Sequence, residues 1–181
     1  MIRRWNEKTK RYEPFEAGAR TYPKLPAELE LQLAQVTPSV GGKVVYFPCA
    51  VALRDGTKAD RTVIVDAASY ISQWGIWPDQ DAMKREVMIG DVVKIGDCSS
   101  RLPPQFAKKL YEAGESGMGY QVFEIGYRSG PRSAHFAGNL VDFVELPAGR
   151  RMSDVIDVYP HKGRNKEHLI PGPDFFWCLT A

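Results

Sequence analysis

Cysteine is scarce in this chain, and its pattern excludes two common kinds of site. The 181 residues include three Cys and three His. An odd, widely spaced set of cysteines argues against a disulfide framework. There is no C-x-x-C pair, and the histidines do not have the spacing of zinc ligands. We therefore expect no metal and no cofactor. The residues concerned are Cys49, Cys98, Cys178, His135, His161 and His168.

Long apolar runs are also missing. The first ten residues, MIRRWNEKTK, lack the apolar stretch of a signal peptide. The longest nearly unbroken apolar run, VVYFPCAVAL, has ten residues, whereas a membrane-spanning helix needs roughly 20. The sequence therefore predicts a cytoplasmic protein with no membrane partner.

The glycine-rich stretch GESGMGYQVF, residues 114–123, does not match the signatures of catalytic loops. Phosphate-binding loops run from a strand through glycines into a helix. Here the expected order is helix, glycines, strand, so the negative end of the helix faces the loop. The nucleophile motif G-x-S-x-G is missed because position 118 is Met. We predict a helix stop and a turn, and no catalytic residue; a bound anion or a reactive Ser116 would overturn this interpretation.

Two other arrangements have a chemical and a structural interpretation. Asp79 and Asp81 have a spacing that can hold Mg²⁺, but they also fit an acidic helix start in which Asp81 pairs with Arg85. Cys98 and His135 are a conceivable thiol–imidazole pair, although a packed histidine in a strand is commoner. The structural interpretation is favoured in both cases, and no resemblance to a known family emerges.

The strands and helices expected from the pattern define the fold class. Residues 43–53 and 60–67 are dense in β-branched and aromatic residues around an Asp-Gly turn, and Pro48 indicates an edge or a bulge. The stretch 89–96 alternates as a short strand. A helix over about 102–113, capped by Ser99 or Ser100 and ended by Gly114, precedes a second hairpin that turns at RSGP. These features predict a β-rich α+β fold: a small, mostly antiparallel curled sheet or SH3-like barrel with one main helix and extended terminal arms.

The organisation expected along the chain has three parts. Residues 1–40 form a basic arm with a possible short helix at 26–36, and residues 41–148 form the β-rich core. Residues 149–181 form an extension that packs on the core or on a partner. Within these parts, 68–90 is expected to be irregular with a helical turn at 79–87, and 152–160 to be a short helix.

Positive charge gathers at the two ends. Residues 1–25 have a net charge of +4, residues 26–147 of −3 and residues 148–181 of +1. In the first segment cations alternate with aromatic residues, as in proteins that bind single-stranded nucleic acid; the alternative is a solvated or self-docking arm. The candidate polyanion-binding residues are Arg3, Arg4, Lys8, Lys10 and Arg11, near Trp5, Tyr12 and Phe15, with Lys162, Arg164, Lys166, His161 and His168 as possible additions.

Aromatic residues suggest an interaction surface. Two clusters, SQWGIWPDQD and FFWCLTA, would expose much apolar surface if they were free. They pack against the body in one interpretation and against a partner or a second copy in the other. The candidate residues are Trp74, Trp77, Phe175, Phe176 and Trp177. We therefore expect a non-enzymatic binding module whose partner is a protein or a second copy rather than nucleic acid; the alternatives are a nucleic-acid-binding protein and an enzyme with an unrecognised site.

Overall fold

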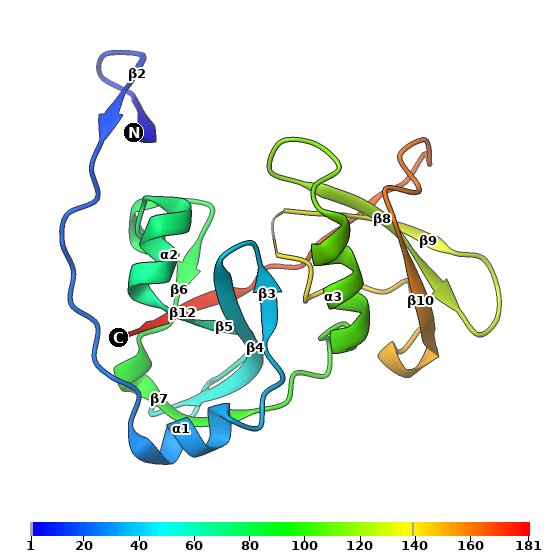
Figure 1. Ribbon diagram of the computed structural model, residues 1–181, viewed down its shortest axis with the longest axis horizontal. Coiled ribbons are helices and arrows are strands. Elements are labelled where there is room, and N and C mark those ends of the chain that lie inside the picture. The colour runs from blue at the N-terminus through cyan, green and yellow to red at the C-terminus, as the bar shows by residue number, and fades with distance from the viewer. Residues whose placement is uncertain (1, 139) are drawn as a thin grey trace.

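The computed structural model describes residues 2–138 and 140–181, with the side chains of residues 2–4 left out. Two lobes, each built on a β-sheet, lie side by side, and a small hairpin at the N-terminal end stands apart from both (Figure 1). The expected α+β class is confirmed. No sheet in the described residues closes on itself, so the SH3-like barrel is not confirmed.

The first lobe contains a six-stranded sheet in the order β3-β4-β5-β12-β6, with β7 also paired to β4. Its strands are β3 (Ser39–Gly41), β4 (Val44–Leu53), β5 (Lys58–Asp66), β6 (Arg85–Glu86), β7 (Val92–Gly96) and β12 (Phe176–Thr180). The β4–β5 hairpin agrees with the prediction. Pro48 lies opposite Val63 of β5, just before a bulge. The other edge of β4 pairs with β3 at residues 44–46 and with β7 at residues 50–53, so Pro48 lies between two partners and no missing amide disrupts a ladder.

The last strand, β12, lies inside this sheet. It pairs in parallel with β5 on one side and with β6 on the other. Trp177, Cys178 and Leu179 are buried. The apolar end of the chain therefore packs on its own body, which is the first of the two interpretations that the sequence left open.

The helical elements of the first lobe include one that the sequence analysis missed. They are α1 (Ala27–Leu33), α2 (Ala67–Trp74) and the single turns η1 (Pro78–Gln80) and η2 (Ile89–Asp91). The expected irregular segment thus begins with α2, which starts where the Asp66 side chain accepts a hydrogen bond from Ser69 N at 2.7 Å. It ends at Gly75, whose φ of 64° is left-handed.

The second lobe is a four-stranded sheet in the order β10-β8-β9-β11, covered by α3 (Pro104–Ala113). The strands are β8 (Gln121–Tyr127), β9 (Ser133–Ala137), β10 (Val155–Pro160) and β11 (Ile170–Pro171). Ala107 and Leu110 of α3 share a buried core with Phe123 and Ile125 of β8. The main helix and the β8–β9 hairpin agree with the prediction, and Gly114 follows the helix with φ 74°.

Two expectations in this lobe are wrong. Pro103, not a serine, precedes α3, and no side chain caps the helix. The segment 152–160 is not a helix, because only Met152–Asp154 form a single turn, η3, and Val155–Pro160 are a strand paired with β8. The β-branched residues of VIDV favour that strand, and its edge pairing supplies the hydrogen bonds that a helix would have made internally.

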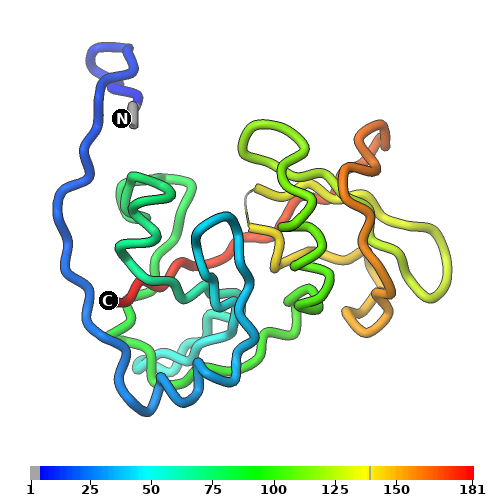
Figure 2. Tube along the Cα trace, in the orientation of Figure 1, coloured from blue at the N-terminus to red at the C-terminus, as the bar shows by residue number. Residues whose placement is uncertain are grey.

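The N-terminal segment is a hairpin followed by an extended run. β1 (Ile2–Asn6) pairs with β2 (Arg11–Phe15), and the chain then runs along the first lobe to α1 (Figure 2). This run is anchored on the first lobe: Tyr22 is buried with its ring centroid 5.5 Å from that of Trp77, and Arg20 pairs with Asp79 at 2.6 Å. Residues 2–15 therefore form a hairpin rather than the simple extended arm we expected.

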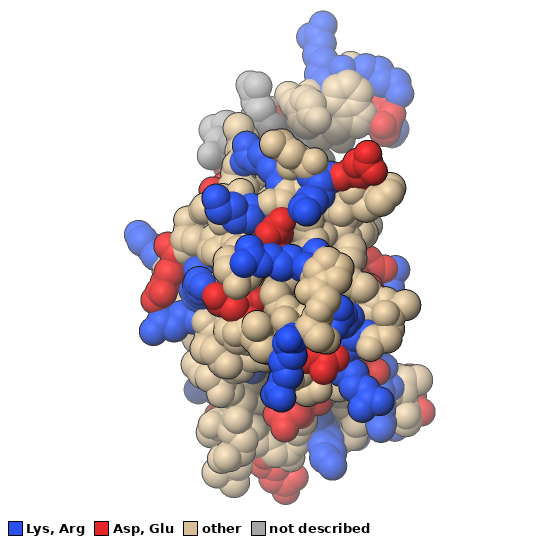
Figure 3. Space-filling model, turned by 90° about the vertical axis from the view of Figure 1, so that its right-hand side faces the viewer, with Lys and Arg blue, Asp and Glu red and all other residues tan. Residues whose placement is uncertain are grey.

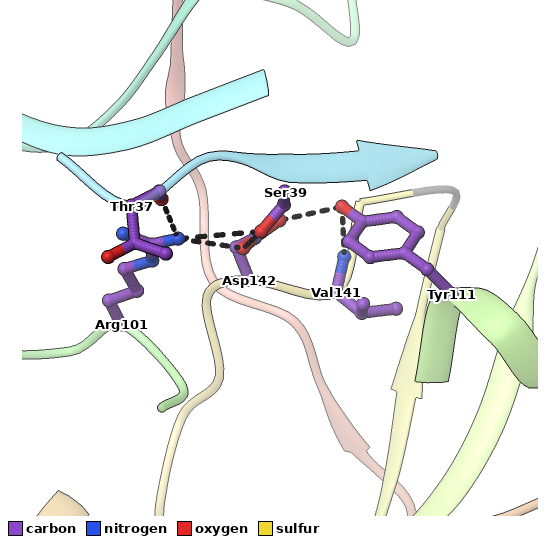
Figure 4. A network of polar contacts seen from close by, with 6 residues as sticks. All are labelled: Thr37, Ser39, Arg101, Tyr111, Val141 and Asp142. Carbon is purple, nitrogen blue, oxygen red and sulfur yellow. Dashed lines mark hydrogen bonds and ion pairs between the residues drawn. The ribbon is translucent and has the colours of Figure 1, made fainter. Parts of the chain in front are cut away.

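A buried polar network joins the lobes (Figure 4). Asp142, in the segment that leaves β9, accepts hydrogen bonds from Ser39 of β3 at 2.5 Å and from Tyr111 of α3 at 2.6 Å. Arg101 lies 3.8 Å from the same carboxylate and donates to Thr37 O at 2.6 Å. Burial raises the pKa of Asp142, while these hydrogen bonds act in the opposite direction. One carboxylate thus links β3 of the first lobe to α3 of the second.

Candidate ligand-binding cleft

A cavity of about 270 Å³ lies between the two lobes. The first lobe supplies one wall, from the end of α2, the segment that leads into β6, and the segment that leads into β12. The second lobe supplies the facing wall, from the loop after α3 and the segment after β9. The residues on the first-lobe side are Trp74, Met83, Lys84, Arg85, Pro173, Asp174, Phe175 and Trp177, and those on the second-lobe side are Gly119, Gly138 and Leu140.

The cleft has an aromatic wall centred on Trp177. The Trp177 ring makes edge-to-face contacts with Trp74 at 5.7 Å and with Phe175 at 5.3 Å between centroids. Strand alternation places Phe175 and Trp177 on the same face of the sheet. Phe176 points to the opposite face, where it packs with Cys178 and the other apolar core. Three of the five predicted interaction residues therefore meet at one cavity.

Trp77, the fifth member of the predicted surface, is a structural residue. Its side chain is buried, and its Nε1 donates to Gly18 O at 2.6 Å. Its ring contacts Tyr22 of the N-terminal segment, and it does not line the cleft. The predicted surface is thus divided: Trp74, Phe175 and Trp177 line the cleft, while Trp77 and Phe176 pack elsewhere.

Lys84 is one of the cleft residues that sequence reasoning missed. Its ammonium lies 4.4 Å from the centroid of the Trp74 ring and 5.3 Å from that of Tyr70, which is cation–π geometry. Asp81 Oδ2 is 3.5 Å away. Burial lowers the pKa of Lys84, and Asp81 opposes that effect. The sequence analysis paired Asp81 with Arg85 on a helix, but residues 81–84 are not helical, and Arg85 instead pairs with Asp174 at 2.8 Å.

The rings beneath Lys84 contribute faces rather than acceptors. In the described part of the chain, Trp74 Nε1 and Tyr70 Oη are buried and have no hydrogen-bond partner. The ammonium therefore rests on π-systems, and its ion-pair partner among the described residues is Asp81. By contrast, the Arg85–Asp174 pair lies at the exposed rim, where solvent screening leaves an ion pair little energetic weight.

A hydrogen bond between Ser116 and His161 holds the loop that carries Gly119. Ser116 Oγ lies 2.9 Å from His161 Nδ1 and accepts from Val122 N at 2.9 Å, while His161 Nε2 is 3.1 Å from Ala113 O. His161 has a left-handed φ of 59°, and Arg164 donates to Ser116 O. The amides of Ser116 and Gly117 both point to Tyr120 O, so they are not free to stabilise an oxyanion. This geometry fits a fastened turn, which is the role the sequence predicted for 114–123.

The other candidate chemistry is dispersed. Asp79 pairs with Arg20 and Asp81 with Lys84. Cys98 is buried beside Ser100 at 3.3 Å, whereas His135 lies in β9, bonded to Ser133 at 2.6 Å and stacked on Phe123. Among residues 2–138 and 140–181, no group of three His, Cys, Asp or Glu side chains could hold a metal ion.

The two basic segments do not come together. The hairpin stands beside the first lobe, and residues 161–168 lie at the far side of the second lobe (Figure 1). Lys8, Lys10 and Arg11 are exposed on the hairpin, with Lys10 paired to Glu7; the side chains of Arg3 and Arg4 lie outside the described part of the structure.

The outer face of the second lobe mixes cations and anions (Figure 3). Lys109 pairs with Asp157 at 2.7 Å and Arg132 with Glu124 at 3.5 Å. The Arg132 guanidinium also lies 3.5 Å from the Tyr159 ring centroid. Because the charges alternate in sign, this face lacks the single-sign field that attracts a polyanion.

Comparisons with protein-family models, with curated proteins and with solved structures found no match. Among the described residues, no helix has the length and apolar character needed to cross a bilayer.

Proposed function

We propose that this chain is a non-enzymatic cytoplasmic binding module that takes one aromatic side chain of a protein partner into the cleft between its lobes. The observation that carries the proposal is the convergence of Trp74, Phe175 and Trp177 on a cavity of about 270 Å³. Clefts between structural units that are lined by aromatic residues are common ligand sites. Tryptophan and other aromatic anchors also dominate the energetics of protein interfaces.

The size of the cavity favours a side chain over a cofactor. Sites for drug-sized ligands and cofactors span roughly 300–1,000 Å³, so this cleft lies just below that range. A single aromatic residue from a partner would fill it and contact Trp74 and Trp177. The partner can be another protein or a second copy of the chain, and sedimentation analysis over a range of concentrations separates these two cases.

The test uses capped single residues as probes. N-acetyl-tryptophanamide and N-acetyl-phenylalaninamide are titrated into the ¹⁵N-labelled protein, with N-acetyl-alaninamide as the apolar control. We expect millimolar binding that shifts the indole N–H signals of Trp74 and Trp177. Phe175→Ala should weaken this binding because it removes one wall of the cleft. Tyr12→Ala, on the distant hairpin, should leave it unchanged. Equal shifts with the alanine probe, or shifts confined to other regions, would refute the proposal.

Nucleic-acid binding by the hairpin is a second candidate, favoured by one observation. The rings of Trp5 and Tyr12 are 41% and 62% exposed and lie beside the exposed Lys8 and Arg11, an arrangement suited to stacking on bases and pairing with phosphates. A titration with oligo(dT) at increasing salt tests it, since phosphate contacts make affinity fall steeply with salt concentration. Absence of binding at low salt would end this candidate.

A further inference from the structure

The charge of Lys84 gives the cleft a preference for an anionic ligand. This inference rests on the proposed function and specifies the ligand of the same site. Lys84 lines the same cavity as Phe175 and Trp177. We propose that the cleft recognises an aromatic residue at the C-terminus of a partner protein, with the ring against Trp74, Phe175 and Trp177 and the terminal carboxylate facing Lys84.

The first step of the argument is that the Lys84 ammonium is under-compensated. Its side chain is 13% exposed and lines the cavity, so the charge is partly buried. An ammonium has three donors, whereas its ion-pair partner in the described residues is Asp81 Oδ2 at 3.5 Å, beyond the usual hydrogen-bond length. A partly buried charge with incomplete partners gains more from a new anion than an exposed one does.

The second step is that the cleft offers no comparable site for a cation. Among the residues that line it, the carboxylate of Asp174 already pairs with Arg85 at 2.8 Å. Asp81, behind Lys84, is bound through Oδ2 to Lys84 and accepts from Met83 N through Oδ1 at 3.1 Å. The wall itself carries two cations and one carboxylate, and the second carboxylate, Asp81, does not line the cavity. The surface that a ligand meets is therefore more positive than negative, which complements an anionic ligand and opposes a cationic one.

The third step concerns the size of the ligand. A cavity of about 270 Å³ holds one residue, so the ring and the negative charge must belong to the same residue. Natural aromatic side chains carry no carboxylate, and an acidic neighbour in a peptide would lie outside the cavity. The chain terminus of a protein is the place where one aromatic residue has both a ring and a carboxylate.

The experiment compares ligands that differ only in charge. N-acetyl-phenylalanine, with a free carboxylate, and its amide are titrated into wild type, Lys84→Met and Arg85→Met, with binding followed by the Trp74 and Trp177 indole signals. A charge-assisted hydrogen bond predicts about tenfold tighter binding of the acid by wild type. Lys84→Met should abolish this preference and still bind the amide, whereas Arg85→Met, which removes the second cation of the wall at its exposed rim, should reduce it only in part. Lys84→Gln replaces Lys84→Met if the latter does not give a cooperative melt.

The outcomes separate the two proposals. Equal binding of acid and amide by wild type would overturn the C-terminal inference and leave the aromatic cleft intact, whereas binding of neither would overturn both. If phenylacetate binds more tightly than N-acetyl-phenylalanine, the occupant is a small aromatic acid and not a protein terminus. The preference for the acid should also fall as rising pH deprotonates Lys84, and a preference that persists in Lys84→Met would place the anion elsewhere.

Discussion

The ammonium of Lys84 lies 4.4 Å from the centre of the Trp74 ring and 3.5 Å from Asp81, and this contact ties the segment before β6 to the end of α2. Both sides of the contact line the cleft. The same lysine therefore shapes the aromatic wall and brings a positive charge to it. Because the charge is partly buried, it should be visible in the pH dependence of stability even without a ligand.

The first prediction concerns that pH dependence. Burial lowers the pKa of Lys84 from 10.5. Between the folded pKa and 10.5 the unfolded chain holds a proton that the folded chain has lost, so the free energy of unfolding should rise with pH in this window. Urea unfolding of wild type and Lys84→Met at a series of pH values measures it. The difference between the two proteins should change in favour of wild type as pH approaches 10.5; a constant difference would show that Lys84 titrates as an exposed lysine.

His135 provides a second test at acidic pH. Burial lowers its pKa from 6.5 to about 4. Between these two values the unfolded chain binds a proton and the folded chain does not. The contribution of the neutral His135 to the free energy of unfolding is therefore fully present above pH 6.5 and is lost as pH falls toward 4. The shift corresponds to about 3 kcal/mol. In His135→Gln this loss should be absent when the free energy of unfolding in urea is plotted against pH. The control, His168→Gln at an exposed position, should show the same pH dependence as wild type.

The network around Asp142 leads to a third prediction. Asp142→Ala leaves the hydroxyls of Ser39 and Tyr111 and the guanidinium of Arg101 without their shared acceptor in the interior. We expect a loss of about 3 kcal/mol or more in the free energy of unfolding. Tyr111→Phe, which removes one donor, should cost about 1 kcal/mol. The double variant should lose less than the sum, because both changes affect one network. Strict additivity would mean that the two groups do not interact. Asp60→Asn, at an exposed position, is the control and should leave the free energy of unfolding nearly unchanged.

The elements that were predicted correctly are those whose signals lie within a few neighbouring residues. The β4–β5 hairpin follows from β-branched runs around Asp55-Gly56, and α3 from an apolar face that ends at Gly114. The helix α2 also has local signals, the Asp66 cap and Gly75, but it is only eight residues long and its apolar pattern is short. The strand β10 was misassigned because its short apolar run suits either element until the pairing with β8 is known.

The cleft depends on contacts that no local pattern contains. Trp74 and Trp177 are about a hundred positions apart in the sequence, and they meet because β12 enters the sheet between β5 and β6. Strand order of this kind is decided by long-range packing. The aromatic residues were identifiable as candidates, because free aromatic clusters are costly in water. Which of them would share a cavity, and that Lys84 would join them, followed only from the fold.

The last prediction contrasts the two ends of the chain. The hairpin β1–β2 pairs with itself, and its aromatic contact, Trp5 with Tyr12 at 5.2 Å, is internal. A lone hairpin contributes little stability, so deletion of residues 1–14 should shift the thermal midpoint by less than about 3 °C, the shift expected for 1 kcal/mol at this size. Deletion of residues 176–181 removes a strand from inside the sheet and unpairs both β5 and β6, and it should abolish cooperative unfolding. Circular dichroism melts of both truncations make the comparison. A large loss of stability from the first deletion would show that the hairpin packs on the body. A cooperative melt for the second would show that the sheet folds without β12.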